Sequence, residues 1–187
     1  MNQVILSLNR DKFPYVNLYF QDESRYRMMT HLGSIIAAKG VQPIVNFKQE
    51  FKNTYLYGSY SPIDGDAFVY EIEQVNCEAF EKYLHAFSKH QPNEYKIVVI
   101  DNTGFHSTKN IHLPDNIHLL RIPPYTPELN PCEQVWKYIK DKYKNICFDS
   151  IEKIKEWLHE FTKGMDQELI KSITSNHHYI NAFMRKY

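Results

Sequence analysis

The sequence predicts a mixed α/β fold, in which helices pack against a sheet of antiparallel and parallel strands. Two kinds of apolar pattern lead to this prediction. Alternating or continuous apolar runs indicate strands, and runs with apolar residues three and four positions apart indicate helices. Their order is strand, hairpin, helix, strand, strand, helix, helix. Antiparallel strands therefore come first and helical crossovers follow, which is typical of a mixed sheet covered by helices.

The first third of the chain is expected to form a strand and a hairpin. In YVNLYFQDES, residues 15–24, the apolar residues Val16, Leu18 and Phe20 alternate, and Asp22 continues the same parity at the predicted end of the strand. Two aromatic and β-branched runs, FKNTYLYGSYSP and DAFVYEIE, are joined across the turn sequence IDGD, which predicts a hairpin.

A helix and two strands are predicted next. Asn76 can cap a helix over NCEAFEKYLHAFSKH. The apolar face of this helix is expected to contain Cys77, Phe80, Leu84 and Phe87. YKIVVIDN is a continuous apolar run of the kind found in strands covered on both faces, and Asp101 stands where that run ends. NIHLLRIP predicts another short strand, which Pro123 and Pro124 close.

The remainder is predicted to be helical. One helix is expected from Pro131 to about Asn145, with Asn130 as its N-cap. Its buried stripe would consist of Cys132, Val135, Trp136, Ile139, Tyr143 and Ile146. A further helix is expected to begin near Asp149, and residues 163–187 have a weaker helical pattern.

Composition limits the classes of function. The 187 residues suffice for one domain with a hydrophobic core. Lys and Arg number 22, as do Asp and Glu, so any contact with nucleic acid must come from local basic patches. The three cysteines, Cys77, Cys132 and Cys147, form no zinc or disulfide pattern. With no leader sequence and no membrane-spanning run, the protein is expected to be soluble and intracellular.

Two aspartates occupy similar places in the predicted sheet. Asp22 and Asp101 each follow an apolar strand, and sites in open α/β sheets collect outside the carboxyl ends of the strands. If the two strands are neighbours, about 5 Å apart, their carboxylates could share a metal ion. Close carboxylates repel unless a cation lies between them, and such oxygen ligands suit Mg²⁺ or Mn²⁺.

Glu133 could complete such a site from the first turn of the predicted helix. Its position also has a simpler explanation, because it lies three residues after Asn130 and can reach back to the N–H of that cap. Lys137, Lys140 and Lys144 share a helix face with Glu133, which suits a metal site beside a phosphate backbone. The alternative for the lysines is a solvated face with a weak Glu133–Lys137 pair.

The segments FQDES, VVIDNTGFHS and PPYTPELNPCEQVWKYIK resemble the catalytic domain of DDE transposases, in the bacterial insertion-sequence branch of the mariner superfamily. The resemblance covers residues 15–150 approximately and implies an RNase H-like fold with a five-stranded mixed sheet, in a single catalytic domain over residues 1–187 that ends in helices over 150–187. It implies that Asp22, Asp101 and Glu133 are the catalytic and metal-binding triad. It also implies supporting roles for Asn102, His106 and Asn130, although His106 has an alternative as an ordinary capping residue.

The resemblance further implies a function. Two Mg²⁺ or Mn²⁺ ions about 3.5–4 Å apart would serve DNA cleavage at element ends and strand transfer into target DNA. The protein would act on DNA in the bacterial cytoplasm, at the nucleoid, as a homo-oligomer, with Lys137, Lys140 and Lys144 binding DNA.

Two departures from the family pattern stand out. The spacing between Asp101 and Glu133 is slightly short, and the helix-turn-helix modules that precede this domain in the family are expected to be absent. A separate helix-turn-helix polypeptide could supply them. The alternatives are a non-catalytic remnant that regulates a partner, or an RNase H-like nuclease that does not join strands.

Overall fold

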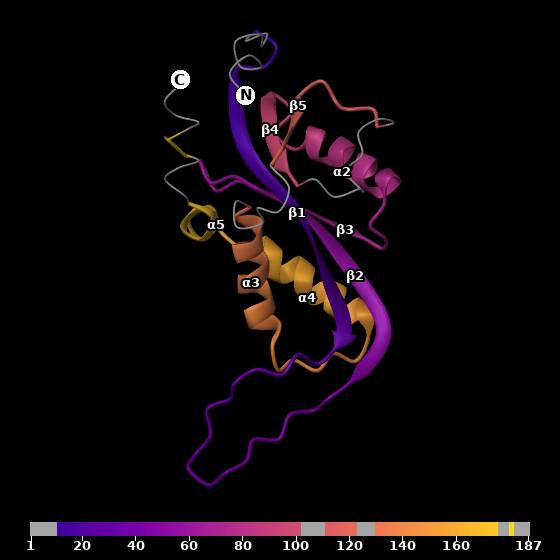
Figure 1. The fold of residues 1–187 in the computed structure, drawn as a ribbon, viewed down its shortest axis with the longest axis vertical. Coiled ribbons are helices and arrows are strands. Elements are labelled where there is room, and N and C mark those ends of the chain that lie inside the picture. The colour runs from indigo at the N-terminus through magenta and orange to yellow at the C-terminus, as the bar shows by residue number, and fades with distance from the viewer. Residues whose placement is uncertain (1–10, 102–110, 123–129, 176–179, 182–187) are drawn as a thin grey trace.

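The computed structural model describes residues 11–101, 111–122, 130–175 and 180–181 (Figure 1). Five strands and four helices are assigned there. They are β1 (Tyr15–Met29), β2 (Gln49–Tyr60), β3 (Ala67–Ile72), α2 (Cys77–Lys89), β4 (Glu94–Ile100), β5 (Ile117–Arg121), α3 (Cys132–Tyr143), α4 (Ile151–Lys163) and α5 (Gln167–Thr174). Within the described residues, no helix is long and apolar enough to cross a membrane.

The strands form one mixed sheet in the order β3-β2-β1-β4-β5. β1, β2 and β3 pair antiparallel, and the parallel strands β4 and β5 continue the sheet from the other edge of β1. The predicted hairpin is therefore confirmed as β2 and β3. Gly65 has a φ of +81° in its turn, a left-handed conformation that glycine adopts without steric cost.

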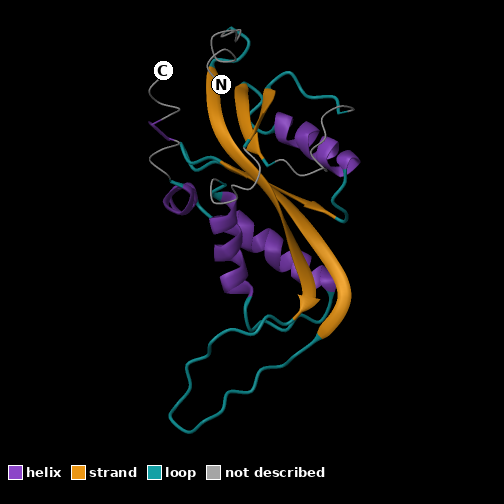
Figure 2. Cartoon of the chain, viewed as in Figure 1, coloured by secondary structure: helices purple, strands orange, loops and turns teal. Residues whose placement is uncertain are grey.

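Helices cover both faces of the sheet (Figure 2). Side chains alternate along β1, so that Leu18 and Phe20 pack with the helices α3, α4 and α5, while Tyr19 packs with α2. The predicted cap of α2 is confirmed, because the Asn76 side chain accepts a hydrogen bond from Ala79 N. Ser150 caps α4 in the same way, with Lys153 N as the donor.

Several predicted details were wrong. β1 does not end near Ser24 but continues to Met29, because its second half pairs with β2. Cys77 is exposed, and Tyr83 takes the fourth buried position of α2. α3 is slightly shorter at both ends than the predicted helix, and Ile146 follows it in a loop, half-buried. The single-domain assignment over residues 1–187 stays a prediction.

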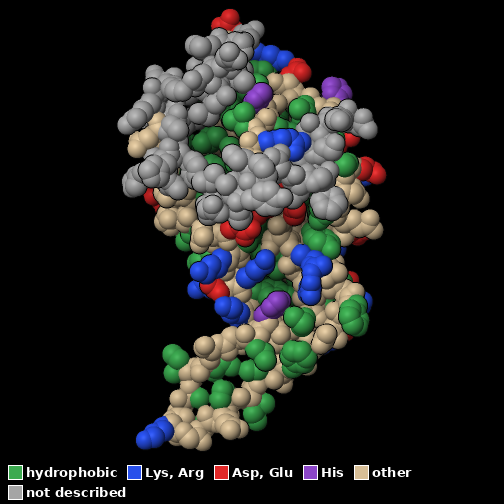
Figure 3. Space-filling view, in the orientation of Figure 1, with side chains coloured by type: hydrophobic (Ala, Val, Ile, Leu, Met, Phe, Trp, Pro, Cys, Tyr) green, Lys and Arg blue, Asp and Glu red, His purple; other side chains and the backbone are tan. Residues whose placement is uncertain are grey.

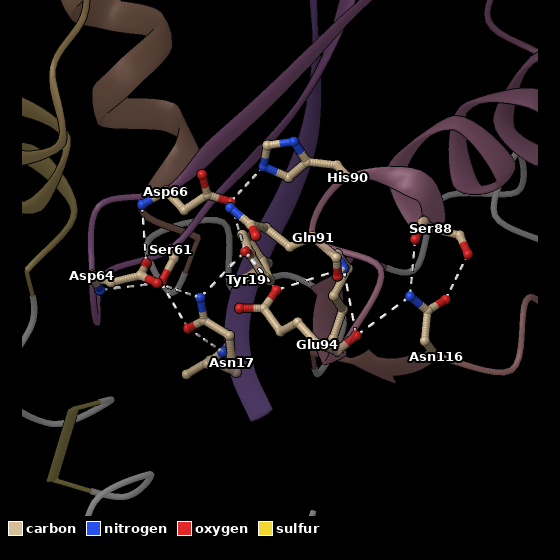
Figure 4. Close-up of polar contacts among 12 residues, drawn as sticks. Asn17, Tyr19, Ser61, Asp64, Asp66, Ser88, His90, Gln91, Glu94 and Asn116 are labelled. Carbon is tan, nitrogen blue, oxygen red and sulfur yellow. Dashed lines mark hydrogen bonds and ion pairs between the residues drawn. The ribbon is translucent and has the colours of Figure 1, made fainter. Parts of the chain in front are cut away.

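A partly buried polar network joins β1, β4, the β2–β3 turn and the end of α2 (Figure 4). The Tyr19 hydroxyl contacts Asp66 Oδ2 at 2.7 Å and Glu94 Oε1 at 2.8 Å. His90 Nε2 lies 2.7 Å from the same oxygen of Asp66. Burial opposes ionisation of Asp66, but the hydrogen bonds from His90 and Tyr19 outweigh it and hold the pKa of Asp66 below its usual value. Burial raises the pKa of Glu94.

An extended arm, residues 31–47, connects β1 to β2 and projects away from the body (Figures 1 and 2). Its base is held by hydrogen bonds between Thr30 and Lys48 and by contacts of His31 and Gly33 with Asn145. Large apolar side chains on the arm are exposed. They are Leu32, Ile35, Ile36, Val41, Ile44 and Phe47, of which Ile36 and Ile44 are almost fully exposed.

Candidate active site

Asp22 lies within β1, not at the end of the strand as predicted. Its location is nevertheless the end of a parallel pair, because the described pairing of β1 with β4 stops at Phe20 and Val99. Continuing this register by two residues places Asp22 level with Asp101, which directly follows the last residue of β4. Residues opposite each other in a sheet point to the same face. The two aspartates therefore lie next to each other on neighbouring chain segments, at the same height along the sheet and on the same face.

Glu133 is brought to this level by contacts that fasten the start of α3 to β1. Asn130 Nδ2 donates to Gln21 O at 3.0 Å, and Cys132 Sγ donates to Phe20 O at 3.0 Å. The N-cap of α3 is Pro131 and not Asn130 as predicted, but the Asn130 side chain still contacts the helix start, since its Oδ1 accepts a hydrogen bond of 3.1 Å from Cys132 N. Asn130 is thus a buried link between helix and strand, while Glu133 is exposed in the first turn.

The electrostatics of Asp22 reflect its crowded surroundings. Burial is the largest influence on its carboxyl group, and the negative charges of Glu23, Glu133 and Asp101 act in the same direction. Together they raise the pKa of Asp22 to about 8. The same group accepts a hydrogen bond from Trp136, whose Nε1 donates to Asp22 Oδ2 at 3.1 Å.

The carboxylates fit a hard divalent cation by their chemistry. They supply oxygen donors of the kind that Mg²⁺ prefers, and a cation would relieve the mutual repulsion that Asp22 experiences. Within the described part of the chain, however, no group of three or more His, Cys, Asp or Glu side chains is already arranged to hold a metal ion. Asp22, Asp101 and Glu133 interact through their charges without forming a preassembled ligand set.

A basic groove of about 720 Å³ begins at Glu133 and runs between α3 and the second half of β1. Its cationic lining is Arg25, Arg27, Lys137, Lys140 and Lys144, and His31 also lines it. Figure 3 shows Lys and Arg side chains gathered in the middle of this face, next to Asp and Glu side chains. The predicted lysine face therefore opens into a groove, although Lys144 lies one residue beyond the end of α3 and forms an ion pair with Asp141.

Some functional candidates were missed or cannot be placed. Arg25 and Arg27 were missed because β1 was predicted to end before them, although they alternate with Tyr26 and Met28 as strand residues do. Trp136 was assigned to the buried stripe without a polar role. Asn102, His106 and the proline-rich segment 123–129 lie outside the described residues.

Comparison with known proteins supports a family assignment. A sequence profile of the DDE superfamily endonucleases matches residues 17–155. The uncharacterized protein y4pE/y4sA of Sinorhizobium fredii is 30% identical over 90 residues, which cover 48% of this chain and 67% of that protein.

Solved transposase structures share the fold. The Mos1 transposase paired-end complex with the left transposon end superposes with a TM-score of 0.65 at 19% identity, covering 92% of this chain and 55% of that one. The Mos1 strand transfer complex gives 0.63 at 17% identity, covering 92% and 54%. This chain thus spans just over half the length of the Mos1 chains. The chain belongs to the DDE superfamily endonucleases, and its RNase H-like fold is that of a DDE transposase catalytic domain.

Proposed function

We propose that this chain cleaves DNA at the ends of a mobile element and transfers the cut strands into target DNA. The observation that carries the proposal is that the charges of Asp101 and Glu133 act on the Asp22 carboxyl group, although the three residues come from β1, the end of β4 and the start of α3. Carboxylates that repel one another are stabilised by a divalent cation. The adjacent basic groove suits a phosphate backbone, and membership of an endonuclease family supports chemistry at a phosphodiester.

Asp22, Asp101 and Glu133 are proposed to hold Mg²⁺ or Mn²⁺, as a pair of ions. When bound, such ions polarise the scissile phosphate and activate the attacking water or 3′-hydroxyl group. The hydrogen bonds from Asn130 and Cys132 hold the first turn of α3 against β1, and they thereby fix the position of Glu133 relative to Asp22. Supporting roles for Asn102 and His106 stay predictions.

The basic groove is proposed to bind the DNA backbone. Lys137, Lys140 and Lys144 on one wall and Arg25 and Arg27 on the other can contact phosphates on both sides of a strand. Such contacts orient DNA but carry no direct sequence information. Recognition of element ends must therefore use other contacts than these, and a separate helix-turn-helix polypeptide is the proposed source of them. The bacterial source of the y4pE/y4sA relative favours action at a bacterial nucleoid.

We also propose that the chain acts as a homo-oligomer. The arm presents several large apolar side chains to solvent, and Figure 3 shows hydrophobic side chains along it. Exposed apolar surface of this extent on a projecting segment marks a protein contact. A second copy is the partner that a DNA-cleaving protein acting at two element ends would need.

A plasmid assay tests the proposed activity. Supercoiled DNA is incubated with the protein and Mn²⁺, and nicked product is followed on a gel. Asp22→Asn, Asp101→Asn and Glu133→Gln should each abolish nicking while leaving the circular dichroism spectrum unchanged. Joined products from end-labelled oligonucleotides would separate a transposase from a simple nuclease. Folded protein that neither nicks nor joins DNA would contradict the proposal and favour a regulatory module.

A further inference from the structure

Trp136 connects α3 directly to the side chain of Asp22. Its indole Nε1 donates a hydrogen bond of 3.1 Å to Asp22 Oδ2. The tryptophan is 1% exposed, so this donor is withdrawn from solvent. A buried indole N–H requires an acceptor, and here the acceptor is a carboxylate of the proposed metal site rather than a backbone carbonyl.

The contact is one of three hydrogen bonds that join α3 and the residues just before it to Phe20, Gln21 and Asp22, which are consecutive in β1. Cys132 and the preceding Asn130 donate to the backbone carbonyls of Phe20 and Gln21. Those two bonds fix the main chain of the strand. The bond from Trp136 instead fixes a side chain, at Oδ2 of Asp22, and the backbone N–H of Glu23 is a second hydrogen-bond donor to the same carboxyl group.

Gly58 provides the space that the indole needs. It is the β2 residue paired with Asp22. A Cβ atom at Gly58 would lie 2.6 Å from Cη2 of Trp136 and 2.7 Å from Cε2 of Tyr60, closer than such atoms can approach. The φ of Gly58 is not positive, so its conformation does not demand glycine. The missing side chain instead lets the indole lie across β2, edge-on to Tyr60 at a ring-centroid distance of 5.5 Å.

We infer that Trp136 is a positioning residue for the proposed metal site, and that Gly58 is the glycine that admits its indole beside Asp22. The inference rests on the proposed function. Trp136 holds one carboxylate oxygen in place and so fixes the orientation in which the Asp22 carboxyl group meets a metal ion. Hydrogen-bonding partners of metal ligands act in this way, and their loss typically lowers metal affinity by about 10–100-fold.

The test compares Trp136→Phe with a matched control, Trp157→Phe. Phenylalanine keeps most of the ring volume and removes the N–H. Trp157 is a half-buried residue of α4 that stacks on Phe161 with ring centroids 4.8 Å apart. Mn²⁺ binding to the intact chain is measured by the electron paramagnetic resonance signal of free Mn²⁺. We expect Trp136→Phe to weaken Mn²⁺ binding about 10-fold or more, and Trp157→Phe to leave it unchanged.

Gly58→Ala tests the spatial half of the inference. In the native background it should weaken Mn²⁺ binding by displacing the indole. In the Trp136→Phe background the effect should be smaller, because phenylalanine has no Cη2 atom for the new methyl group to meet. Equal effects in both backgrounds would contradict the role of Gly58, since residues that act through one contact are not additive.

The Asp22→Asn variant distinguishes failure of the positioning role of Trp136 from failure of the proposed metal site. One outcome is that the wild type binds Mn²⁺ and that Asp22→Asn weakens this binding while Trp136→Phe does not. In that case the positioning role of Trp136 is wrong, but the proposed metal site stands. If the wild type and Asp22→Asn bind Mn²⁺ equally, the proposed metal site fails and the role of Trp136 falls with it.

Discussion

Asp22→Asn is expected to stabilise the metal-free protein at neutral and alkaline pH. Burial and the charges of Glu23, Glu133 and Asp101 raise the pKa of Asp22 from 3.8 to about 8. In the unfolded chain the carboxyl group ionises freely at pH 7, whereas folding forces it either to stay protonated or to carry a crowded, desolvated charge. Asparagine removes this penalty and keeps an oxygen that can accept the hydrogen bond from Trp136.

The sign and size of the effect follow from the raised pKa. Below about pH 4 the carboxyl group is neutral in both states, so wild type and variant should differ little. As pH rises towards 8, the wild type loses stability relative to the variant, by at most about 1.4 kcal/mol per pH unit. The full shift sets an upper limit of roughly 6 kcal/mol. Because Asp22 is partly exposed, we expect about 1–3 kcal/mol at pH 8, or roughly 3–10 °C in melting temperature.

Thermal unfolding in EDTA from pH 4 to pH 9 measures this difference. Asp149→Asn is the control, because Asp149 is an exposed carboxylate outside the site. Mn²⁺ should raise the melting temperature of the wild type, by a free energy near 2.7 kcal/mol at a concentration of 100 times Kd, and should raise that of Asp22→Asn much less. A variant whose advantage is absent at pH 8, or is the same at every pH, would refute the reasoning.

Three further changes test other parts of the structure. Lys137→Gln with Lys140→Gln should weaken binding to all duplex DNA alike and reduce the log–log salt slope by about 0.9 for each lysine; loss confined to one sequence would contradict backbone binding. Asp66→Asn should lower stability by about 1–2 kcal/mol at pH 7, measured by urea unfolding. Since the pKa of Asp66 is depressed, this loss should fade as pH drops below about 4, and a loss that persists there would exclude an ionic contribution. Ile36→Ser with Phe47→Ser should shift an oligomer to monomer in light scattering without lowering the melting temperature; an unchanged mass would exclude the arm as the contact.

Elements whose ends depend on residues close in the sequence were predicted correctly from the sequence. Asn76 caps α2 through Ala79 N, three residues away, and the IDGD turn closes the β2–β3 hairpin within a few residues. The apolar stripe of α3 was correct from Cys132 to Tyr143 because helical periodicity alone determines it.

Features that depend on distant partners could not be predicted. β1 extends to Met29 because β2 offers it a partner. Tyr26 and Met28 alternate as in a strand, but the polar residues 21–25 separate them from the apolar start of β1 and hide this continuation. The bond from Trp136 to Asp22 joins residues 114 positions apart and requires the gap at Gly58, so it follows from the fold and not from the helix pattern. The apolar residues of the arm resemble core residues by composition, yet they lie in solvent.

The most direct test of the central claim is anomalous diffraction from crystals soaked in Mn²⁺. One metal site built from Asp22, Asp101 and Glu133 predicts an anomalous peak within coordination distance, about 2.1 Å, of oxygens from Asp22 and at least one of the other two carboxylates. That peak should disappear in Asp22→Asn crystals. Mn²⁺ bound elsewhere on the protein, with no peak at Asp22, would contradict the claim that these three carboxylates form the catalytic metal site.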